Sequence, residues 1–496
     1  MKEIVCKSFL NGTAYGSGSQ EGMPLVFPAT NEIIGQVEFL SESGLDDAVA
    51  SCKEAQRVWA AYPPAERARV LNKTAALARA RVSELALLEV MDSGKPLQEA
   101  LAVDIFSGAE ALEYFASACA VSRGAYLQLG ANYAQVLREP LGVVAGIGAW
   151  NYPFQIACWK AAPALAAGNA MIFKPSEMTP RSAVVLAEIF QEAGLPDGVF
   201  NVVQGGAKLG QSIVRHPEIK KVSLTGEVDT GKKVFADAAS TLKYLTLELG
   251  GKSPLILFED ADLHNAVQGA MLANFYTQGE ICSNGTRVFV HESIVGKFLD
   301  QLKDCTSRLI TGDPRDEKTQ IGALISKEHR EKVKGYLAKG KSEGAEIFLG
   351  GGEPEFSYGS PLNEGNFILP TVFVGCTDAM AIVKEEIFGP VMSVLTFKDE
   401  DEVLERANNT PYGLAAGLFT RDLRRSDRVC RQLQAGICWV NTYNITPLEA
   451  PFGGFKHSGL GRENSMEALE AYTQSKTIYV ETQDIDSPYR PEDGSN

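Results

Sequence analysis

Two side chains in this 496-residue sequence combine a reactive group with surroundings that suit it to chemistry. Cys282 is followed by the small polar residues 283–285, and a cysteine thiolate attacks carbonyl carbons well near neutral pH. Glu248 stands between Leu247 and Leu249, where loss of water would raise its pKa toward the range of a general base. By composition alone, Cys282 would more simply be a structural cysteine. Glu248 could instead be a carboxylate at a helix start. The two residues are therefore candidates for a nucleophile and a base.

Two glycine-bounded turns are candidates for binding a phosphate. Residues 146–148 (GIG) follow a strand-like run but lack the third small residue of the dinucleotide fingerprint. Residues 226–231 (GEVDTG) have the spacing of a P-loop and precede Lys232, but Lys233 stands where a P-loop has Ser or Thr. A nucleoside triphosphatase is therefore disfavoured. A helix N-terminus that offers its N–H groups to a pyrophosphate and a plain turn both remain open.

The elements that must position these residues change in type along the chain. Helical periodicity covers residues 45–61, 65–92 and 97–119. After residue 136, short apolar runs alternate with helical stretches, which predicts a parallel α/β sheet. The runs are residues 143–147, 170–173, 200–203 and 221–224, and a second series is 253–257, 286–290, 391–395 and 436–440. We therefore expect two α/β domains and, from residue 484 to 496, a disordered tail.

Cysteine and histidine usage bears on disulfides and metals. The nine cysteines include no Cys-x-x-Cys pair, and the five histidines stand far apart. This pattern favours reduced thiols over a disulfide framework and predicts no zinc site.

Charge and hydropathy limit the partners. A net charge of −15 without a dense basic cluster disfavours nucleic acid and anionic membrane surfaces. No stretch approaches the roughly 18 apolar residues of a membrane span, and the first residues do not read as a secretory signal. We expect a cytoplasmic protein with no nucleic-acid or membrane partner.

Six segments together resemble the aldehyde dehydrogenase superfamily, in family order and at family spacing. They are residues 149–154 (AWNYPF), 173–177 (FKPSE), 247–254 (LELGGKSP), 279–287 (GEICSNGTR), 385–390 (EEIFGP) and 451–459 (PFGGFKHSG). The longer forms 150–155 and 282–288, with 461–464, most resemble the betaine aldehyde and trimethylaminobutyraldehyde dehydrogenases of that family. The resemblance implies NAD-dependent oxidation of an aldehyde to an acid through a thiohemiacetal and a thioester.

The resemblance also assigns catalytic roles. It implies that Cys282 is the nucleophile, that the side-chain amide of Asn151 and the backbone N–H of Cys282 stabilise the oxyanion, and that Glu248 activates the hydrolytic water. Glu248 also argues against the coenzyme-A-acylating relatives, which generally lack it. By similarity to bacterial betaine aldehyde dehydrogenases, Lys160 and Glu463 form an auxiliary proton relay, although a buried ion pair would have the same sequence.

Cofactor residues carry over in the same way. Lys174 and Glu177 match positions that hydrogen-bond the adenine ribose, and a carboxylate there favours NAD over NADP. Glu386 and Phe388 match contacts to the nicotinamide side. The remaining predicted cofactor residues are Ala149, Trp150, Ser176, Gly226, Glu227, Thr230 and Leu249. Three residues depart from the family: Glu227 replaces a serine, Glu280 replaces a glutamine, and Asn31 replaces a glycine.

Aromatic residues suggest the substrate. Tyr152, Trp159, Tyr276 and Phe452 match positions that surround a trimethylammonium head, where cation–π attraction replaces hydrogen bonding, and Glu449 would add long-range attraction. Aminoaldehydes and neutral aliphatic or aromatic aldehydes remain alternatives, because aromatic residues line those pockets as well.

The family fold implies a Rossmann-like NAD-binding domain (1–121 and 140–248), a catalytic domain (249–446) and a β oligomerisation arm (122–139 and 470–483). The resemblance also implies a homodimer or homotetramer, and a potassium ion near Asp92 is a family possibility.

Two alternative functions remain. One is a non-catalytic protein with this fold, which would be signalled by loss of the nucleophile or base. The other is a cysteine hydrolase, for which no histidine lies near Cys282.

Overall fold

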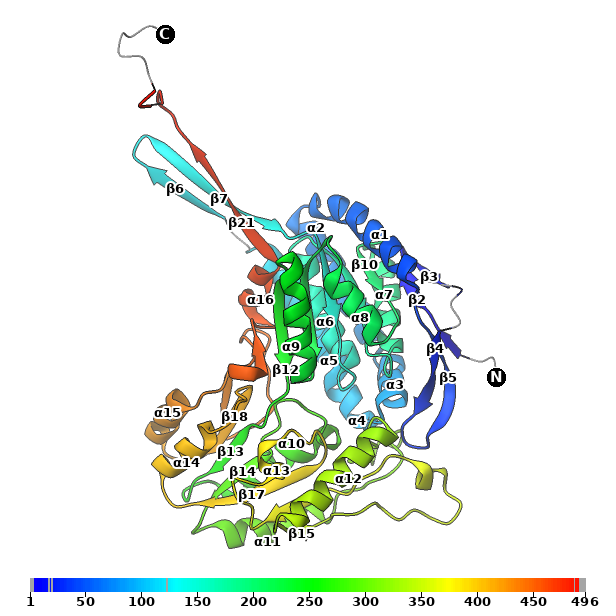
Figure 1. The fold of residues 1–496 in the computed structure, drawn as a ribbon, viewed down its shortest axis with the longest axis vertical. Helices are drawn as coiled ribbons and strands as arrows, with labels where there is room; N and C mark the ends of the chain where they lie inside the picture. Colours follow the sequence, from blue (N-terminus) through cyan, green and yellow to red (C-terminus); the bar gives the residue numbers. More distant parts are fainter. Residues whose placement is uncertain (1–3, 17, 19–20, 122–123, 486, 490–496) are drawn as a thin grey trace.

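An eight-stranded sheet is built from the first half of the chain and one short late strand (Figure 1). The computed structural model describes residues 4–16, 18, 21–121, 124–485 and 487–489. The strands lie in the order β20 (Gly459–Leu460), β12 (Tyr244–Leu249), β11 (Ile219–Gly226), β8 (Val143–Ile147), β9 (Ala170–Lys174), β10 (Phe200–Val202), β2 (Ser8–Leu10) and β3 (Thr13–Tyr15). The strands from β12 to β10 are parallel, whereas β20, β2 and β3 pair antiparallel. The sheet is therefore mixed at both edges, not purely parallel as predicted.

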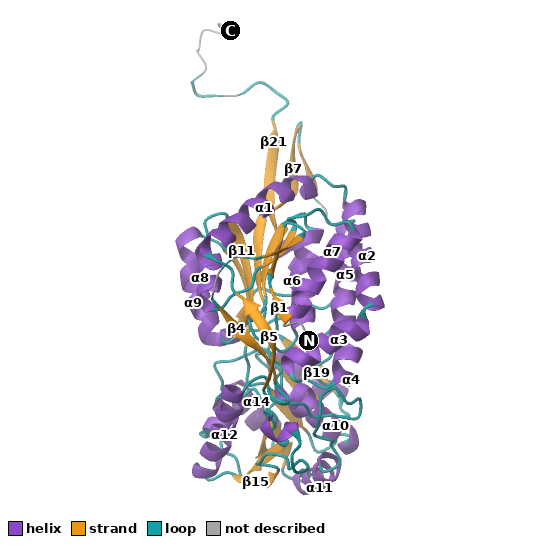
Figure 2. Cartoon of the chain, turned by 90° about the vertical axis from the view of Figure 1, so that its right-hand side faces the viewer, coloured by secondary structure: helices purple, strands orange, loops and turns teal. Residues whose placement is uncertain are grey.

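Helices cover both faces of this sheet (Figure 2). One face carries α1 (Glu42–Ala60), α8 (Ala207–Arg215) and α9 (Val228–Ala238). The other carries α2 (Pro64–Ala80), α3 (Val82–Ser93), α5 (Ile105–Cys119), α6 (Pro153–Ala166) and α7 (Arg181–Ala193). Every residue of β8 and β9 is buried, as expected for parallel strands that helices cover on both sides.

Two of the predicted helices are interrupted. Arg81, with φ −105° and ψ 20°, separates α2 from α3 within the predicted helix 65–92. Within 97–119, a π-helical turn, η1 (Ala100–Asp104), joins α4 (Leu97–Glu99) to α5. Neither Gly nor Pro stands at the breaks, so the apolar periodicity runs through them without a signal.

A seven-stranded sheet forms the second α/β unit (Figure 1). Its strands lie in the order β15 (Glu346–Leu349), β16 (Thr371–Val374), β17 (Val391–Phe397), β14 (Arg287–His291), β13 (Pro254–Leu257), β18 (Ala415–Phe419) and β19 (Ile437–Val440). Only β15 is antiparallel to its neighbour. The helices are α10 (Leu263–Phe275), α11 (Val295–Thr306), α12 (Lys327–Ser342), α13 (Ala381–Lys384), α14 (Glu400–Asn408) and α15 (Leu423–Gln432). The predicted α/β class, with two such units, is confirmed.

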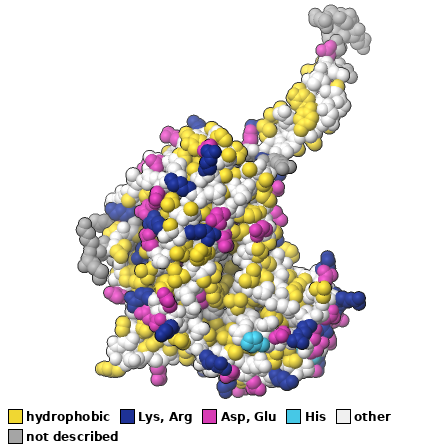
Figure 3. All heavy atoms as spheres, turned by 180° about the vertical axis from the view of Figure 1, so that it is seen from behind, with side chains coloured by type: hydrophobic (Ala, Val, Ile, Leu, Met, Phe, Trp, Pro, Cys, Tyr) yellow, Lys and Arg dark blue, Asp and Glu magenta, His cyan; other side chains and the backbone are white. Residues whose placement is uncertain are grey.

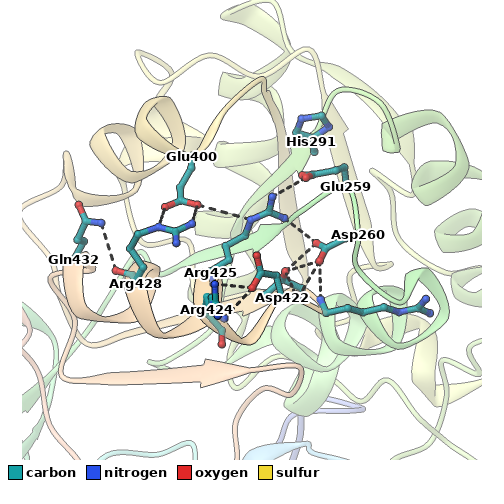
Figure 4. Close-up of polar contacts among 12 residues, drawn as sticks. Glu259, Asp260, His291, Glu400, Asp422, Arg424, Arg425, Arg428 and Gln432 are labelled. Carbon is teal, nitrogen blue, oxygen red and sulfur yellow. Dashed lines mark hydrogen bonds and ion pairs between the residues drawn. The ribbon is translucent and has the colours of Figure 1, made fainter.

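A network of ion pairs ties α15 to α14 and to the end of β13 (Figure 4). The guanidinium of Arg425 donates to Glu259 at 2.7 Å and to Asp260 at 2.9 Å. Arg428 donates through two nitrogens to Glu400 at 2.6 and 2.7 Å. Paired, two-pronged contacts of this kind hold surface helices better than isolated ion pairs do.

A three-stranded arm projects from the body of the molecule (Figure 1). It contains β6 (Ala125–Leu129), β7 (Asn132–Pro140) and β21 (Thr473–Val480), and α16 (Ser465–Ala471) leads into it. The predicted arm segments hold these strands, but residues 122 and 123 lie outside the described residues, as do 486 and 490–496 of the predicted tail. The domain boundaries and the arm's role between subunits stay predictions.

Apolar side chains are exposed along the arm (Figure 3). The large apolar side chains that are more than a third exposed are Tyr126, Leu127, Leu129, Leu137, Ile478 and Tyr479.

A smaller sheet at the N-terminal end joins β1 (Ile4–Cys6), β5 (Glu32–Glu38) and β4 (Gly22–Phe27). Among the described residues, no helix is both long and apolar enough to span a membrane.

Candidate active site

Two cavities meet between the eight-stranded and the seven-stranded sheets. The apolar cavity has a free volume of about 1100 Å³, including its open mouth, and its lining includes Ile156, Leu272 and Ile281. The polar cavity has about 1510 Å³, and its lining includes Lys232 and Glu385. Both are lined by the same four side chains: Asn151, Thr225, Glu248 and Cys282. Molecules bound in the two cavities would therefore meet at this junction.

Cys282 lies at the junction, in the loop that follows η3 (Tyr276–Gly279). The loop is shaped by Thr277 and Gln278, whose φ values of 49° and 41° are in the left-handed region. Burial raises the pKa of the Cys282 thiol to about 12, with smaller contributions from Glu386 and Glu248. The side chain is therefore a thiol in this state, and it needs a base or a nearby positive charge to become a thiolate.

Glu248 comes from β12 and has no hydrogen-bond partner for either carboxylate oxygen among the described residues. Burial raises its pKa well above the usual range, and Glu463 adds to the shift, while Lys160 and Arg462 oppose it. A side chain on Gly453 would place its Cβ 2.6 Å from Glu248 Oε1, so glycine leaves the carboxyl its room. The desolvation predicted from the flanking leucines is present.

Asn151 lies two residues before α6 and is almost fully buried. Its Nδ2 donates to the backbone carbonyl of Glu280 at 2.9 Å, two residues before Cys282. A carboxamide nitrogen carries two N–H groups, so this bond leaves one donor at a group that lines both cavities. The arrangement can supply a hydrogen bond to an oxyanion formed at Cys282.

Lys160 and Glu463 form a buried ion pair beside Glu248. Lys160 Nζ lies 2.7 Å from Glu463 Oε1 and 2.9 Å from the hydroxyl of Ser223, which itself donates to Glu463 at 2.7 Å. Both members of the pair also line the apolar cavity. The structure thus brings together the two residues predicted to form a relay. The buried ion pair, which was the alternative interpretation of these residues, is also present.

The predicted cofactor residues fall into two groups. Those that line the polar cavity are Ala149, Trp150, Gly226, Glu227, Glu386 and Phe388. Those outside its lining are Lys174, Ser176, Glu177, Thr230 and Leu249. Within the second group, Lys174 at the end of β9 donates to Glu177 at 3.2 Å and to the carbonyl of Gly205 at 2.6 Å. These two residues therefore remain together, at the sheet edge where parallel strands end.

Glu386 and Phe388 form one wall of the polar cavity. The backbone N–H of Gly251 donates to Glu386 at 3.3 Å, and burial raises the pKa of this carboxyl to about 7. Phe388 has φ 61° and packs edge-on against Trp150, with ring centres 5.1 Å apart. His329 from α12 bonds to the Phe388 carbonyl at 2.6 Å. The contacts with Trp150 and His329 therefore hold Phe388 in an unusual backbone conformation.

The polar cavity fits a dinucleotide in size and donor set. The N-terminus of α9 opens on it after Gly226, and the side chain of Glu227, at the N-cap, makes no capping bond. The free N–H groups of such a terminus suit a pyrophosphate. The carboxylate of Glu227 opposes an anion there, so this departure from the family weakens the attraction.

Aromatic side chains line the apolar cavity at the positions predicted for the substrate. Trp159 and Phe452 pack edge-on, with ring centres 5.7 Å apart, and Tyr152 and Tyr276 complete the predicted set. Glu449 is exposed and does not line the cavity. Any effect of Glu449 on a ligand is therefore screened by solvent.

Asp92 does not fit a potassium ion in this chain. Arg181 Nε donates to Asp92 Oδ1 at 2.7 Å, and the backbone N–H of Arg181 donates to Oδ2 at 3.3 Å. A cation beside the carboxylate would duplicate the charge of the guanidinium. In the described part of the chain, no group of three or more His, Cys, Asp and Glu side chains is placed to hold a metal.

Asn31 is the third departure, and its conformation explains it. Its φ is 56°, a left-handed value that glycine adopts freely and asparagine tolerates better than most residues. Its amide also exchanges hydrogen bonds with Asn366, each at 3.0 Å. The replacement of glycine is thus accommodated locally.

Some lining residues were not predicted from sequence. Thr225 lines both cavities, and its place at the end of β11, before Gly226, was an available signal. His329 lines the polar cavity from a helix distant in sequence, and Gln155 and Asn444 line the apolar one. Gln155 lies within the segment 150–155 that resembles the family, whereas no local pattern marks His329 and Asn444.

Comparisons with known proteins relate this chain to one enzyme family. A family model described as "Aldehyde dehydrogenase family" matches residues 15–478. A betaine aldehyde dehydrogenase from Vibrio vulnificus is 55% identical over 98% of this chain and 99% of its own length. A second, from Mesorhizobium japonicum, is 53% identical over 97% and 98%.

Solved structures with a similar fold come from the same family. The NAD+ complex of an aldehyde dehydrogenase from Bacillus cereus superposes with a TM-score of 0.93 at 40% identity, covering 97% of both chains. An NAD-dependent aldehyde dehydrogenase from Sinorhizobium meliloti gives 0.94 at 37% identity over 99% of this chain and 97% of that one. The chain belongs to the aldehyde dehydrogenase family. The predicted fold, the enzyme class and the use of NAD are confirmed.

Proposed function

We propose that this enzyme oxidises betaine aldehyde or a similar trimethylammonium aldehyde. The observation that carries the proposal is the Trp159–Phe452 pair, which lies in the wall of a cavity that leads to Cys282. A quaternary ammonium group cannot donate a hydrogen bond, so aromatic rings are its natural receptor. Relatives named betaine aldehyde dehydrogenase support the same substrate.

In the proposed reaction, Cys282 loses its proton to solvent, and the thiolate sulfur adds to the aldehyde carbon and forms a thiohemiacetal. The free N–H of Asn151 and the backbone N–H of Cys282 stabilise the oxygen that becomes negative, each by roughly 3 kcal/mol. NAD, when bound, accepts the hydride. The remaining thioester on Cys282 is hydrolysed by a water from which Glu248 takes a proton, which releases the acid and the thiol.

Glu248 would then pass this proton to the Lys160–Glu463 pair. The short contacts within that pair and with Ser223 support a relay. Burial raises the pKa of Glu248 well above its usual range, which suits a group that holds a proton before passing it on.

The preference for NAD over NADP rests on Glu177. Its carboxylate, next to Lys174, would accept hydrogen bonds from ribose hydroxyls and repel a 2′-phosphate.

One experiment tests the substrate proposal directly. NADH formation is measured with betaine aldehyde and with 3,3-dimethylbutanal, which has the same shape but carbon in place of the charged nitrogen. We expect kcat/KM for betaine aldehyde to exceed that for its neutral isostere by about tenfold or more, the size of one or two desolvated cation–π contacts. Cys282→Ala serves as the inactive control. Equal kcat/KM values would leave a neutral aldehyde as the substrate.

The assembly is also a proposal. We propose that the exposed apolar side chains of β6, β7 and β21 pair with a second subunit, giving a homodimer or homotetramer. Light scattering coupled to gel filtration measures the mass. Replacing Leu127 and Leu129 with Lys is expected to lower it. The predicted cytoplasmic location and domain boundaries rest on the sequence and the resemblance alone.

A further inference from the structure

Glu280 is a buried carboxyl next to the nucleophile loop. It is 1% exposed, and it stands where the family usually has a glutamine. Its Oε1 accepts from the backbone N–H of Ile325 at 3.1 Å, and its Oε2 lies 2.8 Å from Gln278 Nε2. Its backbone carbonyl accepts from Asn151. One residue thus contacts the oxyanion donor and the loop that leads to α12.

The surroundings of this carboxyl do not suit a negative charge. Its nearest basic group is His329, whose Nε2 lies 3.7 Å from Oε1, and burial lowers the pKa of His329 to about 4. The next cation, Lys95, is already paired with Asp104. An ionised carboxylate here would therefore stand without a charged partner, which is strongly unfavourable in a buried site.

Gln278 provides an independent sign of a proton. Its Oε1 is buried without a hydrogen-bond partner among the described residues, while its Nε2 faces Glu280. The two ends of a carboxamide are interchangeable by a half turn. In the turned orientation, Oε1 accepts a hydrogen bond from a protonated Glu280, and the orphaned acceptor is satisfied.

We propose that Glu280 carries a proton in the working enzyme and acts as a positioning residue, with its neutral carboxyl serving the purpose of a glutamine. It orders the loop on which its own carbonyl holds Asn151. It also leaves His329 free to bind the Phe388 carbonyl, because a neutral carboxyl competes for the imidazole N–H less well than a carboxylate does.

The two contacts of His329 link this proton to the cofactor side. His329 Nε2 bonds to Phe388 at 2.6 Å, and its ring packs 5.5 Å from that of Trp150. If Glu280 loses its proton, the carboxylate at 3.7 Å becomes the stronger acceptor. His329 would then leave Phe388, whose left-handed backbone depends on its neighbours. Loss of the proton should therefore weaken NAD binding.

The groups that face Glu280 come from four elements. They are Gln278 on η3, the Ile325 N–H before α12, His329 on α12, and Lys95 after α3. Burial raises the pKa of Glu280 well above its usual range, and these partners only partly oppose the shift. Because the unfolded state ionises at the ordinary pKa, folded stability should fall as pH rises between the two values.

The experiment compares the wild-type enzyme with Glu280→Gln across about pH 6 to 10. NAD+ affinity is read from quenching of protein fluorescence without any aldehyde, so the result is independent of the substrate proposal, although the role of Phe388 rests on the proposed function. We expect the wild-type Kd to rise about tenfold at alkaline pH, as when one hydrogen bond is lost, and that of Glu280→Gln to stay flat relative to it. Glu346→Gln, at an exposed position on β15, is the matched control.

A further measurement separates a proton from a merely structural role. The infrared difference spectrum of wild type minus Glu280→Gln should contain a protonated-carboxyl band at pH 7. A carboxylate band at pH 7, or parallel pH profiles for wild type and Glu280→Gln, would each overturn the proposal.

Discussion

The ammonium nitrogen of Lys95 lies 3.8 Å from the centre of the Tyr152 ring. Lys95 is fully buried and paired with Asp104. A ring that already attracts a cation through one face attracts a second one less through the other. Tyr152 therefore differs from Trp159 and Phe452, whose rings pack edge-on against each other within an apolar cluster.

This difference predicts unequal effects of removing the rings. Trp159→Leu should raise KM for betaine aldehyde by about tenfold, because a desolvated cation–π contact contributes roughly 1–2 kcal/mol. Tyr152→Leu should raise it less. KM for neutral 3,3-dimethylbutanal, measured alongside, controls for changes in cavity shape. A larger effect of Tyr152→Leu on the charged substrate alone would contradict this ranking.

The half-buried thiol of Cys282 predicts a pH dependence. Since its pKa is raised to about 12, the thiolate fraction should grow about tenfold per pH unit throughout the range in which the protein is folded. Alkylation of the enzyme without NAD by iodoacetamide, with the modified residue identified by mass spectrometry, measures this fraction. A rate that levels off below about pH 8 would show that another group lowers the pKa.

Glu248→Gln should separate the two halves of the reaction. A neutral amide cannot take a proton from water, so thioester hydrolysis should slow by about two to four orders of magnitude. Hydride transfer precedes that step. Rapid mixing should therefore show a burst of one NADH per active site, followed by very slow turnover, and the absence of a burst would place Glu248 before hydride transfer.

The central strands of both sheets could be predicted from the sequence because they are buried on both faces. β8 and β9 are continuous apolar runs with glycine or polar residues after them, and the structure places them within one residue of the prediction. The strands of the small N-terminal sheet, half exposed and short, have no such run. Edge strands lack the burial that produces the signal.

The site shows a similar limit. Cys282, Glu248 and Asn151 stand in segments whose resemblance to the family marked them, whereas composition alone favours a structural cysteine at position 282. His329 was missed, because its role depends on α12 reaching the same cavity as Trp150, a contact between residues far apart in the chain. Glu449 stays a prediction, and its exposure could not be judged from sequence spacing.

The pair of Lys160 and Glu463 makes a prediction about stability as well as rate. Lys160→Met should destabilise the protein by about 3–5 kcal/mol, because it leaves Glu463 buried without its cation. The double variant with Glu463→Gln should recover most of that loss, measured by denaturant unfolding. If the pair also relays protons, the double variant stays slow in steady-state turnover at restored stability. Recovery of both would make the pair purely structural.

Arg181 predicts how the protein responds to monovalent cations. Its guanidinium pairs with Asp92, which is 2% exposed, so wild-type Tm should be the same in potassium and choline chloride at equal ionic strength. Arg181→Met removes that cation and leaves a buried carboxylate unpaired, and we expect a lower Tm in choline. Potassium, which could then approach Asp92, should restore part of the loss by binding the folded state. Arg421→Met, at an exposed ion pair with Asp262, is the control and should respond equally to both salts. A potassium-specific rise in wild-type Tm would show that Asp92 still binds the ion despite Arg181.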